Sequence, residues 1–252
     1  MTAPAPGEVH VWLVDLSTPE SATADLARYL DPTELERAKR FRTAAGRRRQ
    51  IVAAGALRRV LADYLGLEPG AVGFRVGPCG KPELALQHGV THLRFNLSHS
   101  EDLALVAVAD GAPVGVDVER LRIVPRASQL ARRYFHEAEI ADLETVNGLE
   151  PESQAFLRCW SCKEAFVKAL GEGLTRPLNT FAVAALTTDP ARLLWDGRDP
   201  TSPAKWGIAD IDVGPEYTAA VAARAPLRVR RLRFDPVSPR LFAPGARPER
   251  HT

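Results

Sequence analysis

Residues 115–119, with the sequence Gly-Val-Asp-Val-Glu, alternate small or acidic residues with valines. Because side chains of a β-strand point alternately to its two faces, the valines are expected to face a core, while Gly115, Asp117 and Glu119 share the opposite face. Two carboxylates on one face, beside a glycine that leaves room for a ligand, form the oxygen-rich kind of site that hard cations such as Mg²⁺ prefer. An edge strand with a solvated polar face would give the same pattern without a metal ion.

A second segment places Trp160, Glu164 and Lys168 at intervals of four residues within a predicted helix, with Lys163 adjacent to this row in the sequence. Residues four apart lie along one face of an α-helix, so the carboxylate and the amine are expected to be neighbours. The pair could belong to a polar site. It could equally be a surface ion pair, which would stabilise the helix by only about 0.2–0.5 kcal/mol.

Three further segments carry polar or basic side chains. Ser98 and His99 lie within residues 95–100, Phe-Asn-Leu-Ser-His-Ser, directly before an apolar strand. Such donors suit phosphate oxygens, although hydroxyl groups in a turn that bond the local backbone would explain them as well. Lys81 presents its amine from a Gly-Lys-Pro loop, and residues 47–49 are three consecutive arginines, a pattern that is also typical of a solvated surface.

Hydrophobic periodicity and turn residues predict the elements that must position these side chains. The predicted strands are 9–14, 74–76, 103–109, 114–119, 180–186, 193–195, 205–213 and 217–223. The predicted helices are 32–42, 47–65, 128–134, 137–145 and 151–170. Asp31 and Pro32 form a helix start, and Gly66 and Gly171 are helix ends. An Asp-Gly pair at 110–111 predicts a hairpin in which 114–119 returns alongside 103–109.

The chain contains a weak internal repeat with an offset of 105 residues. Val9 corresponds to Val114, and the pair Leu65-Gly66 corresponds to Leu170-Gly171. The carboxylates of the second copy have no acidic counterparts in the first. These correspondences predict two copies of one α/β unit, packed as a pseudo-dimer with a metal and anion site at the seam.

Composition excludes several classes of protein. The chain has 252 residues, of which 45% are hydrophobic and 25% charged, values typical of a globular protein with a real core. It contains no run of 18 or more apolar residues, and its first residues lack the pattern of a secretory signal, so no membrane partner and a cytoplasmic location are expected. A net charge of +2 is too small to indicate a nucleic-acid partner.

The three cysteines do not predict a disulfide or a zinc site. Cys159 and Cys162 form a C-x-x-C pair inside a predicted helix, and no second pair of ligands stands at zinc spacing. We therefore expect reduced, structural thiols. The sequence also lacks the glycine-rich nucleotide loops and the H-E-x-x-H and G-x-S-x-G motifs.

Taken together, residues 80–82, 95–100, 115–119 and 160–174 resemble, in order and spacing, the motifs of Sfp-type 4′-phosphopantetheinyl transferases. The resemblance extends over about residues 9–224, and the segment 160–174 is its most specific part. It implies an α+β fold, a pseudo-homodimer of two similar α/β subdomains, each a small antiparallel sheet packed against helices, with the active site between them. A single chain that carries both copies is expected to be a monomer.

The expected boundaries follow from the repeat and the resemblance. Residues 1–112 would form the N-terminal subdomain, and residues 113–225 the C-terminal subdomain with the metal-binding carboxylates. Residues 226–252 would form an Arg/Pro-rich tail, part of which is expected to be loosely ordered.

By resemblance, the enzyme would transfer the 4′-phosphopantetheine arm of coenzyme A to a serine of an apo acyl or peptidyl carrier protein, as a holo-[acyl-carrier-protein] synthase does. The reaction would depend on Mg²⁺ and release adenosine 3′,5′-bisphosphate, and the carriers would serve nonribosomal peptide and polyketide biosynthesis. The implied metal ligands are Asp117, Glu119 and Glu164. Glu164 is also the candidate general base, and Lys168 would stabilise the leaving phosphate.

The resemblance also implies the contacts to coenzyme A. His99, Arg49 and Arg37 would hold its 3′-phosphate, and Lys81 and Pro82 would lie beside its adenine. The full implied set is Arg37, Arg49, Lys81, Pro82, Ser98, His99, Asp117, Lys163 and Lys168.

The sequence also fits two other functions. Another Mg²⁺-dependent phosphoryl or nucleotide-processing enzyme could use the same three carboxylates without a protein acceptor. A non-catalytic carrier-binding or nucleic-acid-binding module could be built on residues 47–49 and the basic tail, and its binding would depend strongly on salt.

Overall fold

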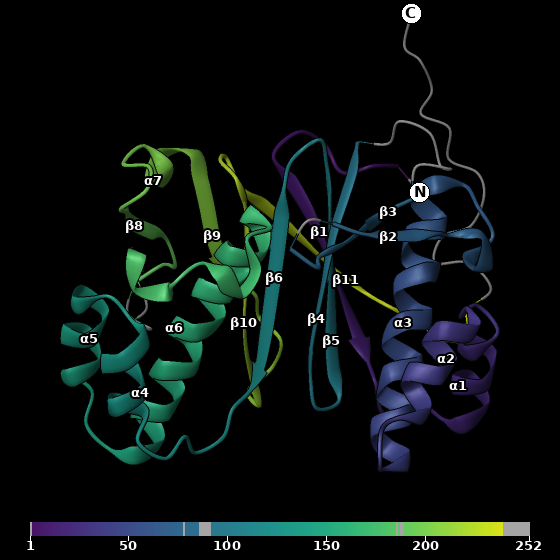
Figure 1. Cartoon of the computed structure of the whole chain (residues 1–252), viewed down its shortest axis with the longest axis horizontal. Helices are drawn as coiled ribbons and strands as arrows, with labels where there is room; N and C mark the ends of the chain where they lie inside the picture. Colours follow the sequence, from purple (N-terminus) through teal and green to yellow (C-terminus); the bar gives the residue numbers. More distant parts are fainter. Residues whose placement is uncertain (1, 78, 86–91, 185, 187–188, 239–252) are drawn as a thin grey trace, which may run out of the picture.

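The computed structural model describes residues 2–77, 79–85, 92–184, 186 and 189–238, without the side chain at 174 (Figure 1). The helices are α1 (Glu20–Ala27), α2 (Pro32–Lys39), α3 (Ala44–Leu65), α4 (Ala127–Tyr134), α5 (Glu137–Glu144), α6 (Leu149–Leu170) and α7 (Ser202–Lys205), with single 3₁₀ turns at Pro69–Ala71, Gly173–Thr175 and Leu178–Thr180. The strands are β1 (Glu8–Asp15), β2 (Phe74–Val76), β3 (Pro82–Leu84), β4 (Leu93–Ser100), β5 (Leu103–Asp110), β6 (Val114–Arg120), β7 (Phe181–Val183), β8 (Leu193–Asp196), β9 (Trp206–Asp210), β10 (Tyr217–Arg224) and β11 (Arg228–Arg233).

Two sheets lie back to back at the centre of the molecule, and a long helix covers the outer face of each (Figure 1). The first sheet has the strand order β11-β1-β5-β4 and is covered by α3, and the second has the order β6-β10-β9 and is covered by α6. Between the sheets lies an apolar layer of buried residues from both, including Val11, Ala107, Val116 and Val221. The result is a four-layer stack of helix, sheet, sheet and helix.

The predicted fold class is confirmed, and the internal repeat corresponds to repeated elements. Helix α2 at 32–39 corresponds to α5 at 137–144, and α3 at 44–65 corresponds to α6 at 149–170, each at the offset of 105 residues. Both long helices end at a left-handed glycine, Gly66 or Gly171. Helix α2 begins with a capping box formed by Asp31 and Glu34, as the Asp-Pro start predicts.

One sequence expectation about the strands is wrong, and two strands were not predicted. The Asp110-Gly111 turn does not form a hairpin between β5 and β6, because β5 pairs with β1 and β4 while β6 pairs with β10 in the other sheet. Residues 93–100, for part of which a turn was one of two interpretations, form the edge strand β4. Within the basic tail, residues 228–233 form β11, which pairs in parallel with β1, whereas residues 239–252 lie outside the described part of the chain. No helix in the described part of the chain is long and apolar enough to span a bilayer.

Candidate active site

Asp117 lies at the seam between the two halves, and its carboxylate contacts both. Its Oδ1 atom accepts hydrogen bonds from the Ser98 hydroxyl of β4 at 2.9 Å and from the Lys168 ammonium of α6 at 2.6 Å. Its side chain is 6% exposed, and its Oδ2 atom is buried without a hydrogen-bond partner among the described residues. Leaving a buried polar atom unpaired is unfavourable by about 1–3 kcal/mol, and by more for a charged group. This oxygen is therefore available to a cation.

The row on α6 is present as the sequence predicts. Trp160, Glu164 and Lys168 are half-buried, whereas the residues between them are buried. Trp160 packs against Phe135 and Phe156 of the core under α6, so only Glu164 and Lys168 lie toward Asp117. Burial raises the pKa of Glu164, the charge of Lys168 lowers it, and the charges of Asp117 and Glu119 raise it again. The three carboxylates therefore lie within electrostatic range of one another.

Glu119 is the third of these carboxylates and lies nearer the surface. Its Oε2 atom accepts a hydrogen bond from Arg122 at 3.0 Å and a long one from Ser100 at 3.5 Å. Within the described ranges no group of three or more acidic, histidine or cysteine side chains is arranged so that it could hold a metal ion by itself. The unpaired Oδ2 atom of Asp117 and the nearby carboxylate of Glu164 fit a hard cation that takes its other ligands from water and substrate.

Basic side chains gather at the end of β4. Arg49, near the start of α3, donates to Asp102 from Nε at 2.9 Å and lies 2.7 Å from Glu101 through Nη1. Partial burial and the positive charges of Lys168 and Arg49 lower the pKa of His99, although part of its ring is exposed. Arg37 is exposed on α2, and no described contact joins it to this group.

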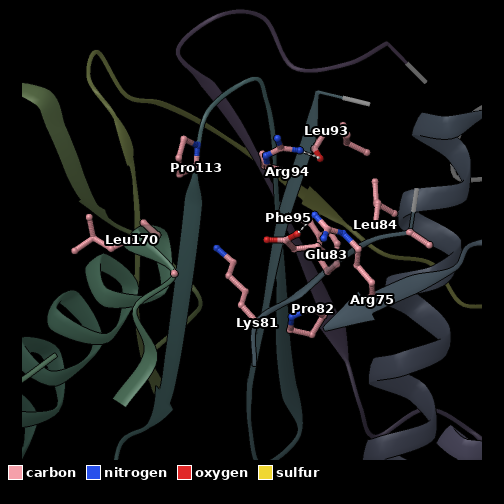
Figure 2. A pocket seen from close by; sticks show the side chains of 13 residues that line it. Arg75, Lys81, Pro82, Glu83, Leu84, Leu93, Arg94, Phe95, Pro113 and Leu170 are labelled. Atoms are coloured by element: carbon pink, nitrogen blue, oxygen red, sulfur yellow. Dashed lines mark hydrogen bonds and ion pairs between the residues drawn. The ribbon is translucent and has the colours of Figure 1, made fainter. Parts of the chain in front are cut away.

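Lys81 and Pro82 line a hollow of about 610 Å³ between the β2–β3 hairpin, β4 and the end of α6 (Figure 2). Figure 2 shows the Lys81 side chain extending toward β6 rather than into solvent. Its ammonium donates to the carbonyl oxygens of Val114 at 2.7 Å and Lys168 at 2.6 Å. Burial lowers the pKa of Lys81 to about 8. The amine thus contacts the opposite half of the protein, while Pro82 remains exposed at the edge of the hollow.

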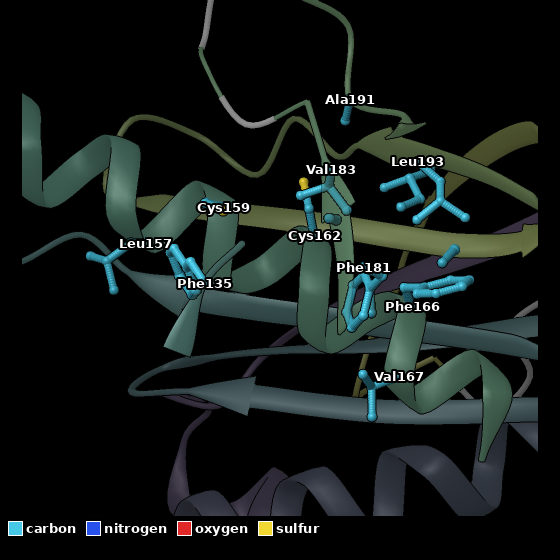
Figure 3. Close-up of a cluster of buried hydrophobic side chains, with 14 of the residues drawn as sticks. Phe135, Leu157, Cys159, Cys162, Phe166, Val167, Phe181, Val183, Ala191 and Leu193 are labelled. Atoms are coloured by element: carbon cyan, nitrogen blue, oxygen red, sulfur yellow. The ribbon is translucent and has the colours of Figure 1, made fainter. Parts of the chain in front are cut away.

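The expectation that Lys163 contacts coenzyme A is wrong. Lys163 is 0% exposed and lies 2.5 Å and 2.6 Å from the two carboxylate oxygens of Glu139, which is also fully buried. Its ammonium also donates to the carbonyl oxygen of Phe181 and lies over the ring of that residue. Figure 3 shows Phe181 within the aromatic core that packs against α6. A helix turns by about 100° per residue, so Lys163 faces this core when Glu164 faces the side of α6 toward Asp117. Cys159 and Cys162 are buried in the same core as free thiols.

Gly115 has a different role from the one expected. A Cβ atom at this position would lie 2.1 Å from the carbonyl oxygen of Ala165 and 2.3 Å from the amide nitrogen of Ala169. The glycine is therefore needed because α6 packs directly against β6, and not because a ligand approaches there. This close packing holds Asp117 within reach of Lys168.

Family models match both halves of the chain. A model described as "4'-phosphopantetheinyl transferase, N-terminal" matches residues 18–110, and one described as "4'-phosphopantetheinyl transferase superfamily" matches residues 113–222. Among solved structures, the complex of Chronobacterium ammoniagenes ACPS with CoA aligns with a TM-score of 0.33 and 20% identity over 46% of this chain and 98% of that chain.

Curated relatives align over most of the chain. The 4′-phosphopantetheinyl transferase HetI of Nostoc sp. is 40% identical over 215 residues, which cover 85% of this chain and 87% of HetI. The 4′-phosphopantetheinyl transferase Sfp of Bacillus subtilis is 29% identical over 202 residues, 79% of this chain and 84% of Sfp. The two-half fold, the motifs brought together at its seam and these relatives agree. The chain belongs to the 4′-phosphopantetheinyl transferase superfamily and, within it, to the Sfp type.

Proposed function

We propose that this enzyme uses Mg²⁺ to transfer 4′-phosphopantetheine from coenzyme A to a serine of an apo carrier protein, at the seam where β4, β6 and α6 meet. The observation that carries the proposal is the Asp117 carboxylate, which binds Ser98 of one half and Lys168 of the other and keeps one buried oxygen unpaired. Asp117, Glu119 and Glu164 would hold the metal ion. When bound, Mg²⁺ supplies positive charge for the diphosphate of coenzyme A.

In the proposed reaction the hydroxyl oxygen of the carrier serine bonds to the phosphorus next to pantetheine. The bond from that phosphorus to the bridging oxygen breaks, and adenosine 3′,5′-bisphosphate leaves. Glu164, on the side of α6 that lies toward Asp117, would accept the serine proton directly or through water. Lys168, whose ammonium donates to the Asp117 carboxylate, stabilises the charge that develops on the leaving phosphate.

The remaining proposed contacts are those to coenzyme A and to the carrier protein. Ser98, His99 and Arg49 would bind phosphate oxygens, and Arg37 would add a charge to the 3′-phosphate from α2. The hollow beside Pro82 would receive the adenine. Beside Glu119, a second hollow is lined by Arg120 and Arg122 together with Glu101 and Glu119, and a polar carrier surface would fit there. We infer a monomer, because one chain supplies both halves of the site.

The direct test is to incubate the protein with coenzyme A, Mg²⁺ and a panel of apo carrier proteins and then to measure the mass of each carrier. Transfer predicts the added mass of one phosphopantetheine group and an equal amount of adenosine 3′,5′-bisphosphate. Release of nucleotide products without any carrier modification would indicate a phosphoryl enzyme of another kind. Binding of a carrier without any change in mass would indicate a non-catalytic module.

Replacing Arg49 with alanine is expected to raise the KM for coenzyme A about tenfold with a smaller change in kcat, because a charge-assisted contact to phosphate contributes about 1.5–3 kcal/mol. Steady-state kinetics with a modified carrier as product check this result. Arg28→Ala is the matched control, since Arg28 is 80% exposed and pairs only loosely with Asp25. An unchanged KM in the Arg49 variant would remove this residue from the binding site.

Coenzyme A is expected to bind more tightly as the pH falls through the range in which His99 titrates. The pKa of His99 is lowered in the free enzyme, and a bound phosphate dianion raises it again, so binding takes up a proton. Affinity increases as the pH falls between these two pKa values and levels off below the free-enzyme value. Calorimetric titrations at several pH values measure the trend, and His99→Gln should flatten it while the exposed control His92→Gln should not.

A further inference from the structure

The seam between β4 and β6 lacks the main-chain ladder that joins strands within a sheet. The two strands form edges of different sheets, yet they run side by side and in the same direction. Asn96 Oδ1 accepts a hydrogen bond from the amide of Val116 at 2.8 Å, and Ser100 Oγ accepts one from the amide of Arg120 at 3.0 Å. The same offset of 20 residues relates both pairs. Side chains of β4 therefore occupy the places that carbonyl oxygens of a neighbouring strand would occupy.

Lys81 is a third residue of the N-terminal half whose side chain bonds the backbone of β6. Lys81 donates to the carbonyl oxygen of Val114, at the start of β6, and to that of Lys168, in the last turn of α6. A cation is favourable at the carbonyl end of a helix. The Lys81 amine is largely buried, and burial lowers its pKa to about 8. Its two contacts therefore tie the β2–β3 hairpin to both elements that carry the reacting groups.

We propose that Lys81, Asn96 and Ser100 are positioning residues, which replace a strand partner along the free edge of β6 and so set the register in which Ser98 meets Asp117. Ser98 lies between Asn96 and Ser100 on the same face of β4, and its hydroxyl bonds the Asp117 carboxylate. Because residues on one face repeat every two positions, a slip of one residue would turn this face away. A slip of two would place Ser98 opposite Gly115 or Glu119.

The physical reason for the three contacts is the cost of an unpaired edge. Backbone amides of a buried edge strand must find partners, and the rest of β6 already pairs with β10 on its other side. Val116 is fully buried, so water cannot readily satisfy its amide. Removal of the Asn96 acceptor should therefore release this part of β6 locally while both sheets stay folded.

The test measures hydrogen exchange at single amides in the full chain. In Asn96→Leu, exchange at the Val116 amide should accelerate about tenfold or more, and in Ser100→Ala the same should hold for Arg120. The amide of Val108, on the central strand β5, should not change. Ser100→Thr keeps the hydroxyl and should restore protection, and the exposed Asn147→Ala is the matched control for the asparagine substitution. Unchanged exchange at Val116 and at Arg120 would overturn the proposal.

The activity arm of the test depends on the proposed transferase function. If Lys81, Asn96 and Ser100 position Asp117, kcat for carrier modification should fall about tenfold in Asn96→Leu. The KM for coenzyme A should stay within about twofold of the wild-type value. If the wild-type protein modifies no carrier, the proposed function is rejected. The exchange result still decides whether the β4 side chains position β6. If Asn96→Leu unfolds the protein, hydrogen exchange will also accelerate at Val108. In that case the milder pair, Ser100→Ala and Ser100→Thr, tests the proposal.

Discussion

Replacing Asp117 with asparagine is expected to lower carrier modification by about 10³-fold or more, with little loss of stability. The substitution keeps the shape of the side chain but removes the negative charge that pairs with Lys168 and, in the proposed function, holds the metal ion. Stability should change little, because the carboxylate is already buried with one unpaired oxygen, which is itself unfavourable. Carrier mass and thermal unfolding, measured on the same preparation, check both parts.

A matched control separates the effect of this position from that of any lost carboxylate. Asp110 is exposed at the end of β5, so Asp110→Asn removes the same charge without touching the site. In the wild type, Mg²⁺ should increase the affinity for coenzyme A, and this increase should be absent in the Asp117→Asn variant. Calorimetry with and without the metal measures it. Wild-type turnover in the Asp117 variant would mean that the reaction occurs elsewhere on the molecule.

The second large effect is expected from Gly115→Ala, which should destabilise the protein by about 3 kcal/mol and abolish transfer. The new methyl group would meet the backbone of Ala165 and Ala169 at 2.1 Å and 2.3 Å, and backbone atoms of a helix cannot move aside as a flexible side chain can. Helix α6 would have to shift away from β6, and Lys168 and Glu164 would shift with it. For a chain of this size, the loss corresponds to a fall in Tm of roughly 10 °C.

Gly70→Ala is the control for this prediction. A Cβ atom at Gly70 would meet nothing within 4 Å, and its backbone is not in the left-handed region, so the change should stay within about 0.5 kcal/mol. Thermal and urea unfolding of both variants give the comparison. Equal stability of the two variants would show that α6 and β6 can separate at low cost, contrary to the packing described above.

Much of the architecture was predictable because it depends on local patterns. Periodicity and end signals identify the helices at 32–39, 44–65 and 149–170, and the repeat at an offset of 105 residues identifies the pseudo-dimer. Strands β4 and β11 were missed. The first is rich in polar residues that face the other half, and the second is an arginine-rich segment whose pairing with β1 joins residues about 220 positions apart.

The candidate site shows the same division between local and distant information. The spacing of Trp160, Glu164 and Lys168 predicts their common face, and the same geometry indicates that Lys163 points elsewhere. Its partner, Glu139, lies on another helix, 24 residues away in the sequence, and no local signal identifies it. Lys81 likewise reads as a ligand-facing amine until its contacts with Val114 and Lys168 are seen.

By itself, the sequence determined which chemical groups the protein carries and which faces of a strand or helix they occupy, because those properties follow from residue type and backbone period. The tertiary structure decided which of these groups meet. Ser98, Asp117 and Lys168 come from three elements and two halves, and they converge because small residues let the two sheets and α6 pack closely. Contacts of that kind depend on the packing of distant segments, which the order of residues along the chain does not state directly.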